Sequence, residues 1–599
     1  MDKKNAFPLT LAQFDIYIHQ SLFPSIPFYN IGGYIKCGSV DVERIKSAHK
    51  KLIMSHDAFG LRILSSSSDI HQFVSSERNT ELPVIDFSEQ PEPESAALEW
   101  IQKTNETSLE LEGTELFRAY LIKTGPQSYW YFLLSHHLIM DGLSIAIVCK
   151  KLAQYYDNPH FVESEMLDWS DISLQDIQYK ENARYLKDKE FWSKFCSNRA
   201  EPMLQPIYRQ NFSESKIVPS RRQTLKLQRS LVDKLENLSR ELNVGLSQIF
   251  LSVISIYYSI AHQRKQLFFG VPSHNRRNFA QKKMIGLFTN VNPLQLDINQ
   301  EISVREYVTY LTRLQKSCYR YQRFPSGELV REFGDIQMNT SFYDVVFNYS
   351  KQTHDCVFNG VDSEINYLAH NYEQVPVSFF VWDNNSGEVD IHVDYNLAYY
   401  QDQEITFIIK RLDSLFNHFI FNQDRCIGEL KIIPECESGF LDQVLNAQLA
   451  PYQGPSQLHE QFEYAVNLHA NQIALICEDS QLTYAQLDEA ANAFAHELIS
   501  QGVREQMLVG LCFERSAELM VAILAVLKVG GAYVPLDPAF PQARLDFMLA
   551  DAALSFVVTQ VKLVDLFKLN NAVRIISLDN NYQGLIAKYP ASKPICSQK

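Results

Sequence analysis

Hydrophobic residues run without alternation through residues 128–134, SYWYFLL, and this pattern predicts a strand buried on both faces. After Gly142, apolar residues recur at spacings of three and four, which predicts an amphipathic helix with Ser144 as a possible N-cap; these residues are Ile145, Val148, Leu152 and Tyr155. The residues between the two patterns therefore occupy a tight loop from strand to helix. That loop carries His136, His137 and Asp141.

Helices and strands continue to alternate along the chain. Residues 246–263, LSQIFLSVISIYYSIAHQ, predict a mostly buried helix, and QLFFGVP predicts the strand after it. Later examples are the strand EVDIHVDYN and the helix ITFIIKRLDSLFNHFI. An α/β architecture with two lobes is the simplest account of this order. From Asn422 to Gln457 the pattern weakens and prolines interrupt it, which indicates a linker, and a separate unit starts near Leu458.

Length and composition narrow the class of protein. The 599 residues, 46% of them hydrophobic, are too many for one core and predict several packing units. The formal net charge of -15 argues against nucleic acid or a membrane surface as a partner. The ten cysteines form no C-x-x-C pair, which indicates reduced thiols, and no apolar run is long enough for a signal peptide or a membrane span. We therefore expect a soluble, cytoplasmic protein.

The two adjacent histidines are the candidate catalytic residues. A lone histidine beside a core strand more often makes a structural hydrogen bond than it catalyses a reaction. Here, however, His-His-x-x-x-Asp-Gly places four special positions within seven residues at the end of a buried strand, where sites are common. Asp141 supplies a charge that can hold the loop, and Gly142 lets the backbone approach a substrate channel. The heptad resembles the signature H-H-x-x-x-D-G of the condensation domains of nonribosomal peptide synthetases.

Further motifs of that family follow in the correct order from residue 8 to about residue 434. LTLAQFDIY resembles the opening S-x-A-Q motif, with Gln13 in register. HDAFGLRIL resembles the His-Glu-x-x-Leu-Arg stretch, although Asp57 replaces the glutamate and Gly60 adds one residue before Arg62. Later matches are GVPSHNRRN, MIGLFTNVNPLQLDI, SFYDVVFNY and VDIHVDYN. YQRFPSGEL stands where most members have His-Gln-x-x-Pro-Phe.

This resemblance implies an α/β fold of two chloramphenicol-acetyltransferase-like lobes in a V. The first lobe would be residues 1–180, the second lobe residues 181–434, and the linker residues 435–457. Carrier domains would enter the tunnel between the lobes from opposite ends, each with an acyl group as a thioester on 4′-phosphopantetheine. The acceptor's amine would attack the donor thioester and form an amide. The chain itself would bind no cofactor and no metal.

The resemblance also assigns roles to residues by position. His137 is the catalytic histidine, and His136 either shares that role or makes a loop hydrogen bond. Asp141 pairs with an arginine that Arg276 matches, and Arg62 gives structural support to the site.

Elementary chemistry limits what His137 contributes. An α-amino group has a pKa of about 7.7 to 8.0, so a useful neutral fraction exists without a strong base. An imidazole with a pKa of about 6.5 can still remove the proton from the tetrahedral intermediate, which is typically worth ~10² to 10⁴ in rate. Holding two tethered reactants together supplies the larger part of the acceleration.

Residues 458–599 resemble a different family. LTYAQLD and LKVGGAYVPLDP resemble the first two core motifs of adenylation domains, the AMP-binding enzymes that activate amino acids with ATP. Alone, the glycine pair would indicate only a helix C-cap before a buried strand. The phosphate loop and the C-terminal lysine of that family find no match before Lys599. We therefore expect an incomplete α/β adenylation-type subdomain without adenylation activity.

Three functions stay open at this point. The first is condensation of carrier-bound acyl and aminoacyl groups, and the second is acyl transfer from free acyl-CoA, which the adenylation-type segment argues against. The third is a carrier-docking module without catalysis. Because the first lobe begins almost at Met1, we expect the donor carrier in trans and the acceptor carrier downstream. The donor is either a fatty acyl group, as in starter-type members, or a peptide.

Basic residue pairs are a second possible contact with an acidic carrier domain. They are Arg221 with Arg222, Arg276 with Arg277, and Lys282 with Lys283. Apart from Arg276 itself, a solvated surface is the better interpretation of each pair.

Overall fold

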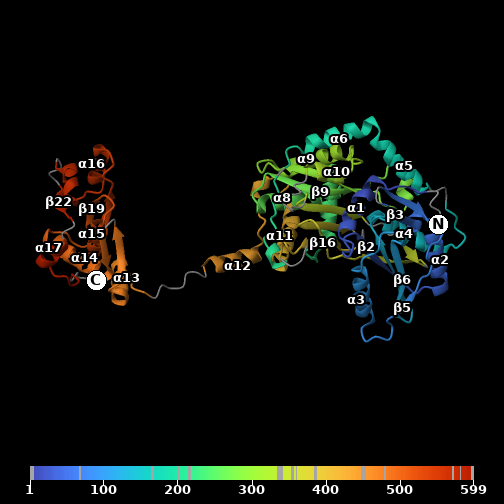
Figure 1. Ribbon diagram of the computed structural model, residues 1–599, viewed down its shortest axis with the longest axis horizontal. Coiled ribbons are helices and arrows are strands. Elements are labelled where there is room, and N and C mark those ends of the chain that lie inside the picture. Colours follow the sequence, from blue (N-terminus) through green and yellow to red (C-terminus); the bar gives the residue numbers. More distant parts are fainter. Residues whose placement is uncertain are drawn as a thin grey trace. The chain divides into compact units, whose positions relative to one another are not determined.

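The computed structural model describes residues 6–66, 69–163, 167–199, 201–212, 217–333, 342–351, 356–358, 360–383, 387–446, 454–477, 480–568, 573–579 and 582–594. The chain divides into two compact units, unit 1 (Met1–Leu441) and unit 2 (Asp442–Lys599), and each is described by itself. Figure 1 labels many of the helices and strands.

A five-stranded sheet with the order β14-β2-β7-β6-β5 forms the first lobe of unit 1. Its strands are β2 (Asn30–Gly38), β5 (Val84–Asp86), β6 (Phe117–Gly125), β7 (Ser128–His136) and β14 (Glu364–Tyr367). A smaller sheet has the order β1-β4-β3, from β1 (Phe7–Pro8), β3 (Leu61–Ser65) and β4 (Ile70–Val74). The helices are α1 (Leu11–Leu22), α2 (Val42–Ser55), α3 (Pro93–Asn105) and α4 (Gly142–Asp157).

Strand β7 lies at the centre of that sheet, and its side chains are buried on both faces. Trp130 and Phe132 pack with the apolar residues of α3, whereas Tyr131 and Leu133 pack with those of α2 and α4. Burying each such side chain is worth about 1.5 to 3 kcal/mol. The strand predicted from SYWYFLL is therefore confirmed, and it ends at the buried His136.

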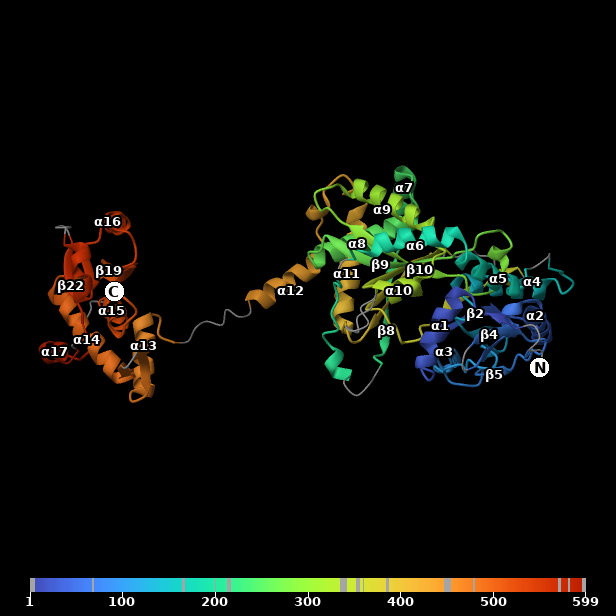
Figure 2. The same cartoon turned by 45° about the horizontal axis from the view of Figure 1, so that its top comes forward.

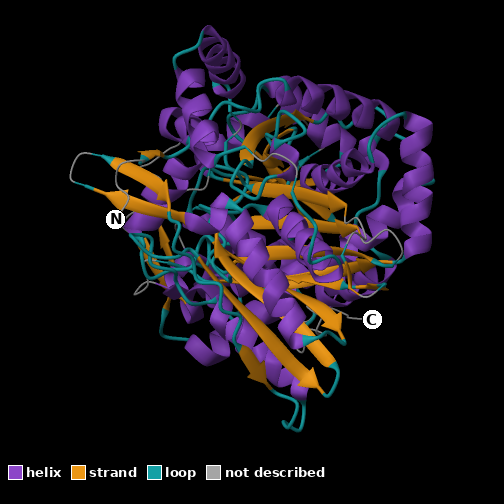
Figure 3. Cartoon of the chain, turned by 90° about the vertical axis from the view of Figure 1, so that its right-hand side faces the viewer, coloured by secondary structure: helices purple, strands orange, loops and turns teal. Residues whose placement is uncertain are grey.

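The second lobe is a six-stranded sheet with the order β10-β9-β11-β15-β16-β8. Its strands are β8 (Ser220–Leu227), β9 (Gln266–Ser273), β10 (Asn290–Asp297), β11 (Val345–Lys351), β15 (Val377–Asp383) and β16 (Val389–Asn396). Its helices are α7 (Arg229–Leu242), α8 (Leu246–Ala261), α9 (Val304–Tyr319), α10 (Ser326–Phe333) and α11 (Asp402–Phe419). The predicted buried helix is α8, which packs between α9 and α11 and against β9. Figure 3 shows helices, in purple, packed beside the strands, in orange.

The later part of the sequence contributes strands to the first lobe. Strand β14 follows the second-lobe strand β11 in sequence, yet it pairs antiparallel with β2 of the first lobe. The short strands β12 (Val357–Phe358) and β13 (Val361–Asp362) pair with each other, and β12 packs against α4. The predicted boundary at residue 180 therefore does not separate the lobes completely, because strands β12 and β14 from the later sequence belong to the first lobe. The alternation of helices and strands gives no sign of this, because it predicts elements and not their partners.

Helices α5 (Trp169–Lys180) and α6 (Ala183–Cys196) connect the lobes (Figure 2). Helix α5 contacts β1 of the first lobe, and α6 contacts α10 and β10 of the second lobe.

Part of the predicted linker, residues 435–457, is helical. Helix α12 (Glu435–Asn446) follows Pro434 and has Glu435 and Glu437 in its first turn, where acidic side chains favour the positive end of the helix dipole. The Glu437 carboxylate accepts two hydrogen bonds from Arg411 of α11. The weak pattern of this stretch did not predict a helix, which the first-turn charges and this contact with α11 stabilise.

Unit 2 is a four-stranded parallel sheet with the order β20-β19-β21-β22 and a two-stranded β17-β18 hairpin. The strands are β17 (Ile473–Cys477), β18 (Ser480–Thr483), β19 (Leu508–Cys512), β20 (Ala532–Leu536), β21 (Phe556–Thr559) and β22 (Arg574–Ser577). The helices are α13 (Leu458–His469), α14 (Tyr484–Ser500), α15 (Ala517–Lys528), α16 (Gln542–Asp551) and α17 (Tyr582–Lys588). Buried residues of α14, α15, β19 and β21 share one core.

Within the described residues, no single helix has the length and apolarity to cross a membrane. Only α7 and α8 taken together pass such a test, and a bend of 104° separates them. Eight of the ten cysteines are free thiols, while the side chains of Cys436 and Cys596 lie outside the described part of the chain.

Candidate functional site

Strand β7 and helix α4 hold the two ends of the histidine loop. The strand ends at His136, and Asp141 caps α4 because its carboxylate accepts a hydrogen bond from Ser144 N at 3.0 Å. The prediction of Ser144 as the N-cap was therefore wrong by three residues. Aspartate is as strong an N-cap as serine, and it stands where its carboxylate reaches the first turn.

Asp141 is fully buried, and its carboxylate accepts three hydrogen bonds on each oxygen. Oδ2 accepts from Arg276 Nη1 at 2.7 Å, Phe288 N at 3.1 Å and Thr289 Oγ1 at 3.2 Å. Oδ1 accepts from Arg276 Nη2 at 3.0 Å and from the N and Oγ of Ser144 at 3.0 and 2.8 Å. Burial raises the pKa of Asp141, but Arg276 and the other donors together outweigh burial and hold it below its ordinary value. The carboxylate is therefore a structural anion with little capacity to accept a substrate proton.

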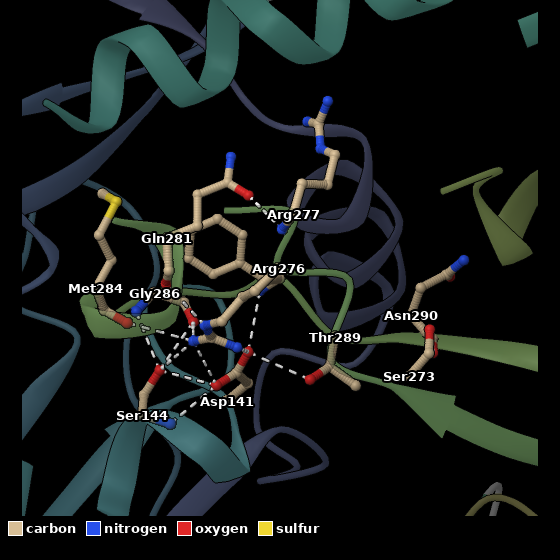
Figure 4. Close-up of polar contacts among 11 residues, drawn as sticks. Asp141, Ser144, Ser273, Arg276, Arg277, Gln281, Met284, Gly286, Thr289 and Asn290 are labelled. Atoms are coloured by element: carbon tan, nitrogen blue, oxygen red, sulfur yellow. Dashed lines mark hydrogen bonds and ion pairs between the residues drawn. The ribbon is translucent and has the colours of Figure 1, made fainter. Parts of the chain in front are cut away.

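Arg276 comes from the second lobe, after β9, and reaches the loop of the first lobe (Figure 4). It also donates hydrogen bonds to the carbonyl oxygens of Gln281, Met284 and Gly286 at 3.1, 3.3 and 3.3 Å. Its guanidinium lies 4.4 Å from the centre of the Phe288 ring. The structure thus brings together Asp141 and Arg276, as the motifs predict, and the pair joins the two lobes.

His136 is buried and held at both ring nitrogens. Its Nδ1 accepts the Leu138 N–H at 3.1 Å, and its Nε2 lies 3.5 Å from Gln20 Oε1 of α1. Burial, and secondarily His137, lower the pKa of His136 to about 3. This ring is therefore neutral at every pH at which the protein would work.

His137 is half-buried and differs from His136 in its hydrogen bonds. Its backbone N–H donates to Tyr29 O at 2.7 Å, while its ring Nδ1 is buried without a hydrogen-bond partner among the described residues. Burial lowers the pKa of His137, and the charge of Asp141 partly offsets that effect. The ring can therefore take up a proton without breaking a hydrogen bond at Nδ1.

A third histidine, His370, lies between β14 and β15, and its charge influences the pKa of His137. Its Nδ1 accepts the Tyr372 N–H at 3.2 Å, and its Nε2 lies 3.3 Å from the Glu373 carboxylate. Like His136, it is committed at both nitrogens. Sequence patterns did not point to His370, because it lies in a segment without regular spacing.

Helix α1 supports the loop with two glutamines. Gln13, which the opening motif predicted, donates to Leu138 O at 2.9 Å and exchanges hydrogen bonds with Gln72 of β4. Gln20 was missed, although it lies seven residues later and so on the same face of the helix. That spacing was the available signal.

Arg62 does not reach the histidine loop through any contact among the described residues. It lies on β3 and binds Glu115 at 2.8 Å together with the carbonyl oxygens of Phe59 and Leu61. Its support of the site is at most indirect, through the β1-β4-β3 sheet. Gly142 is exposed, and a Cβ atom there would meet nothing within 4 Å, so the residue borders open space.

The basic pairs divide between surface and interior. Lys282 and Lys283 are exposed, as the solvated interpretation predicts. Arg222 is different, because it forms two hydrogen bonds of 2.6 and 2.7 Å with the buried Asp394 of β16. The expectation that Arg222 is solvated was therefore wrong. The alternation of β8 turns it toward that carboxylate, while Arg221 faces outward.

An open pocket of about 680 Å³ lies between α3 of the first lobe and β8 of the second. Ser220, Arg222, Tyr367 and Tyr372 are among the residues that line it. Tyr372 also contacts Phe28, the neighbour of Tyr29, so the pocket wall continues toward His137. No group of three or more His, Cys, Asp or Glu side chains within the described ranges is arranged to hold a metal ion.

Family models match most of the chain. The model described as Condensation domain matches residues 3–441, and the model described as AMP-binding enzyme matches residues 462–590. The dimodular nonribosomal peptide synthase of Bacillus subtilis (strain 168) is 27% identical over 593 residues, which are 97% of this chain and 25% of that protein. Surfactin synthase subunit 1 of the same organism is 25% identical over 570 residues, which are 93% of this chain and 16% of that protein. The chain thus spans a quarter or less of these relatives.

Solved structures agree on the fold. The match to the starter condensation domain of rhizomide synthetase RzmA spans 72% of this chain and 100% of that domain's chain, with a TM-score of 0.61 and 21% identity. The match to holo-AB3403, a four-domain nonribosomal peptide synthetase bound to AMP and glycine, spans 96% of this chain and 44% of the synthetase chain, with a TM-score of 0.66 and 17% identity. Since the first family model matches well over half of the residues, the chain belongs to the condensation-domain family and continues into a segment of the AMP-binding enzyme family.

Proposed function

We propose that unit 1 joins an acyl thioester to an amine and so forms an amide bond, with His137 as the catalytic residue. The observation that supports this role is the difference among the three neighbouring histidines. In His136 and His370, Nδ1 is committed to a backbone N–H, whereas the Nδ1 of His137 makes no hydrogen bond within the described residues. A general base needs a ring nitrogen whose lone pair is not already occupied by a hydrogen-bond donor.

The chemistry then follows from the groups present. The amine nitrogen attacks the thioester carbonyl carbon and gives a tetrahedral intermediate with a positive nitrogen and a negative oxygen. His137 removes the proton from that nitrogen, the carbon–sulfur bond breaks, and the thiolate leaves and takes up a proton. Thioester and amine become amide and thiol, so atoms and charge balance without a metal. Because burial lowers the pKa of His137, its ring is neutral and able to accept the proton near pH 7.

The substrates are expected to arrive on carrier domains, as thioesters of 4′-phosphopantetheine. The pocket between α3 and β8 supports an approach at the junction of the lobes, since its wall leads through Tyr372 and Phe28 toward the loop. A variant of the rhizomide synthetase starter domain was solved in complex with C8-CoA. We therefore include medium-chain fatty acyl groups among the donors, beside peptidyl groups, and aminoacyl groups as acceptors.

An assay of donors and acceptors tests this function. The purified chain would be mixed with an aminoacyl carrier and with either an acyl carrier or free acyl-CoA, and the products would be read by intact mass. Amide formation from the carrier-bound donor supports the proposal. Transfer from free acyl-CoA alone would favour the second function, and binding of both carriers without product would favour a docking module.

A further inference from the structure

Gln20 holds His136 from the side opposite the loop. Its side chain is buried, and its Nε2 donates to two backbone carbonyl oxygens, Phe23 O and Ile26 O, both at 2.8 Å. A rotated amide would place its oxygen against those two carbonyl oxygens, which repel it. The orientation of Gln20 is therefore fixed by its own helix end, and its Oε1 faces His136 Nε2.

The hydrogen bonds around His136 require a single tautomer. The Leu138 N–H occupies the lone pair of Nδ1, so Nδ1 cannot carry a hydrogen. Gln20 offers only an acceptor to the other nitrogen, so the hydrogen sits on Nε2. His137 and the Tyr29 ring, whose centre lies 6.1 Å from that of His136, also lie near it. Neither contact within the described residues offers a second donor to His136.

This tautomer sets the shape of the loop that presents His137. The Leu138 N–H is bound by His136 Nδ1, and the Leu138 carbonyl oxygen is bound by Gln13 Nε2 at 2.9 Å. The backbone N–H and the backbone carbonyl oxygen of Leu138, the residue directly after His137, are thus both held by hydrogen bonds. If His136 carried a hydrogen on Nδ1, that atom would meet the Leu138 N–H and push the turn open.

We propose that Gln20 is a positioning residue, which selects the neutral Nε2–H form of His136 so that its Nδ1 holds the Leu138 N–H and aims His137. His136 then takes no part in proton transfer. This inference rests on the proposed function, because it explains how the catalytic ring is placed. A misplacement of about 1 Å at a catalytic group can lower a rate on the order of 10²-fold.

Substitutions of His136 distinguish the roles of its two ring nitrogens, Nδ1 and Nε2. In His136→Asn the amide oxygen can take the place of Nδ1, whereas in His136→Gln the amide reaches only the position of Nε2. We expect His136→Asn to keep most of the wild-type kcat, and His136→Gln and His136→Ala to lower it on the order of 10²-fold. The acid limb of the pH profile, which reports His137, should stay in place in His136→Asn. An equal loss in Asn and Ala variants that melt like the wild type would overturn the proposal.

The tautomer itself is measurable without turnover. With ¹⁵N-labelled histidine in the full chain, the His136 signals, assigned by their loss in His136→Asn, should show hydrogen on Nε2 and a lone pair on Nδ1. We expect Gln20→Met to disturb this pattern of ring hydrogens and to reduce kcat by a larger factor than it changes KM. The control Gln403→Met, at the exposed start of α11, should change neither the pattern nor the kinetic constants. Hydrogen on Nδ1 in the wild type would refute the inference and leave the proposed function standing. Wild-type turnover by His137→Ala would refute the catalytic role of His137 and leave both amide formation and the tautomer unaffected.

Discussion

Arg276 and Asp141 lie 135 residues apart in sequence, yet their side chains meet in two hydrogen bonds of 2.7 and 3.0 Å and are almost completely shielded from solvent. Asp141 belongs to the loop between β7 and α4, and Arg276 follows β9, so the pair crosses from one lobe to the other. It therefore holds the histidine loop and the lobe junction in one arrangement.

Removal of one partner should leave a buried, uncompensated charge. We expect Asp141→Ala to lower the free energy of unfolding by about 3 to 5 kcal/mol, because the Arg276 guanidinium would lose its counter-charge in a dry site. Arg276→Ala should produce a similar loss. Chemical denaturation of both variants, with the exposed Asp171→Ala as the control, measures this effect. Wild-type stability in Asp141→Ala would contradict the role of the pair.

His137→Ala is expected to lower amide formation by ~10² to 10⁴ while leaving the fold and carrier binding intact, because the ring handles a proton and not packing. Burial lowers the pKa of His137, so its neutral form persists below the ordinary histidine range. Once the protonation of the acceptor amine, whose pKa is about 7.7 to 8.0, is corrected for, the kcat/KM of the wild type should therefore stay level as the pH falls to about 6.5, the ordinary histidine value, and decline only at lower pH. Pre-steady-state assays across pH, with the exposed His160→Ala as the control, test both statements.

The sequence predicted the core elements of this site and one of its supports, Gln13, but not the others. Strand β7, helix α4 and the partners Asp141 and Arg276 follow from burial patterns and ordered motifs, because these features are local or carried by the family resemblance. Gln20, His370 and the pairing of β14 with β2 depend on contacts between distant segments, which periodicity does not encode. The burial of Arg222 was missed for the same reason, since Asp394 lies on another strand.

Stability should fall in mild acid because of buried neutral histidines. His49 and His56 are almost fully buried, and burial above all lowers the pKa of each to about 4. Between the unfolded value of about 6.5 and that folded value, the unfolded chain binds more protons than the native one. Each histidine should therefore lower the free energy of unfolding by about 1.4 kcal/mol for each unit by which the pH falls through this window.

Urea denaturation at several pH values between about 7 and about 4.5, which span most of that window, checks this slope. We expect His49→Gln to reduce the slope of the free energy of unfolding against pH by the contribution of one proton, even if it lowers stability at neutral pH. An unchanged slope in that variant would show that His49 does not titrate between the two states in this range.

Two glycines near the site should respond in opposite ways to an added methyl group. At Gly286 a Cβ atom would lie 2.1 Å from the buried Trp169 ring, and the Gly286 carbonyl oxygen accepts a hydrogen bond from Arg276. Gly286→Ala should therefore destabilise unit 1 by about 1 to 3 kcal/mol through overpacking.

At Gly142 the same atom would meet nothing within 4 Å, so Gly142→Ala should melt like the wild type. If Gly142 borders the substrate path, its variant should raise KM without a change in stability, and thermal melting beside steady-state kinetics separates these effects. Equal melting temperatures for both variants would mean that the Trp169 contact at Gly286 yields easily, and the prediction of overpacking would be wrong.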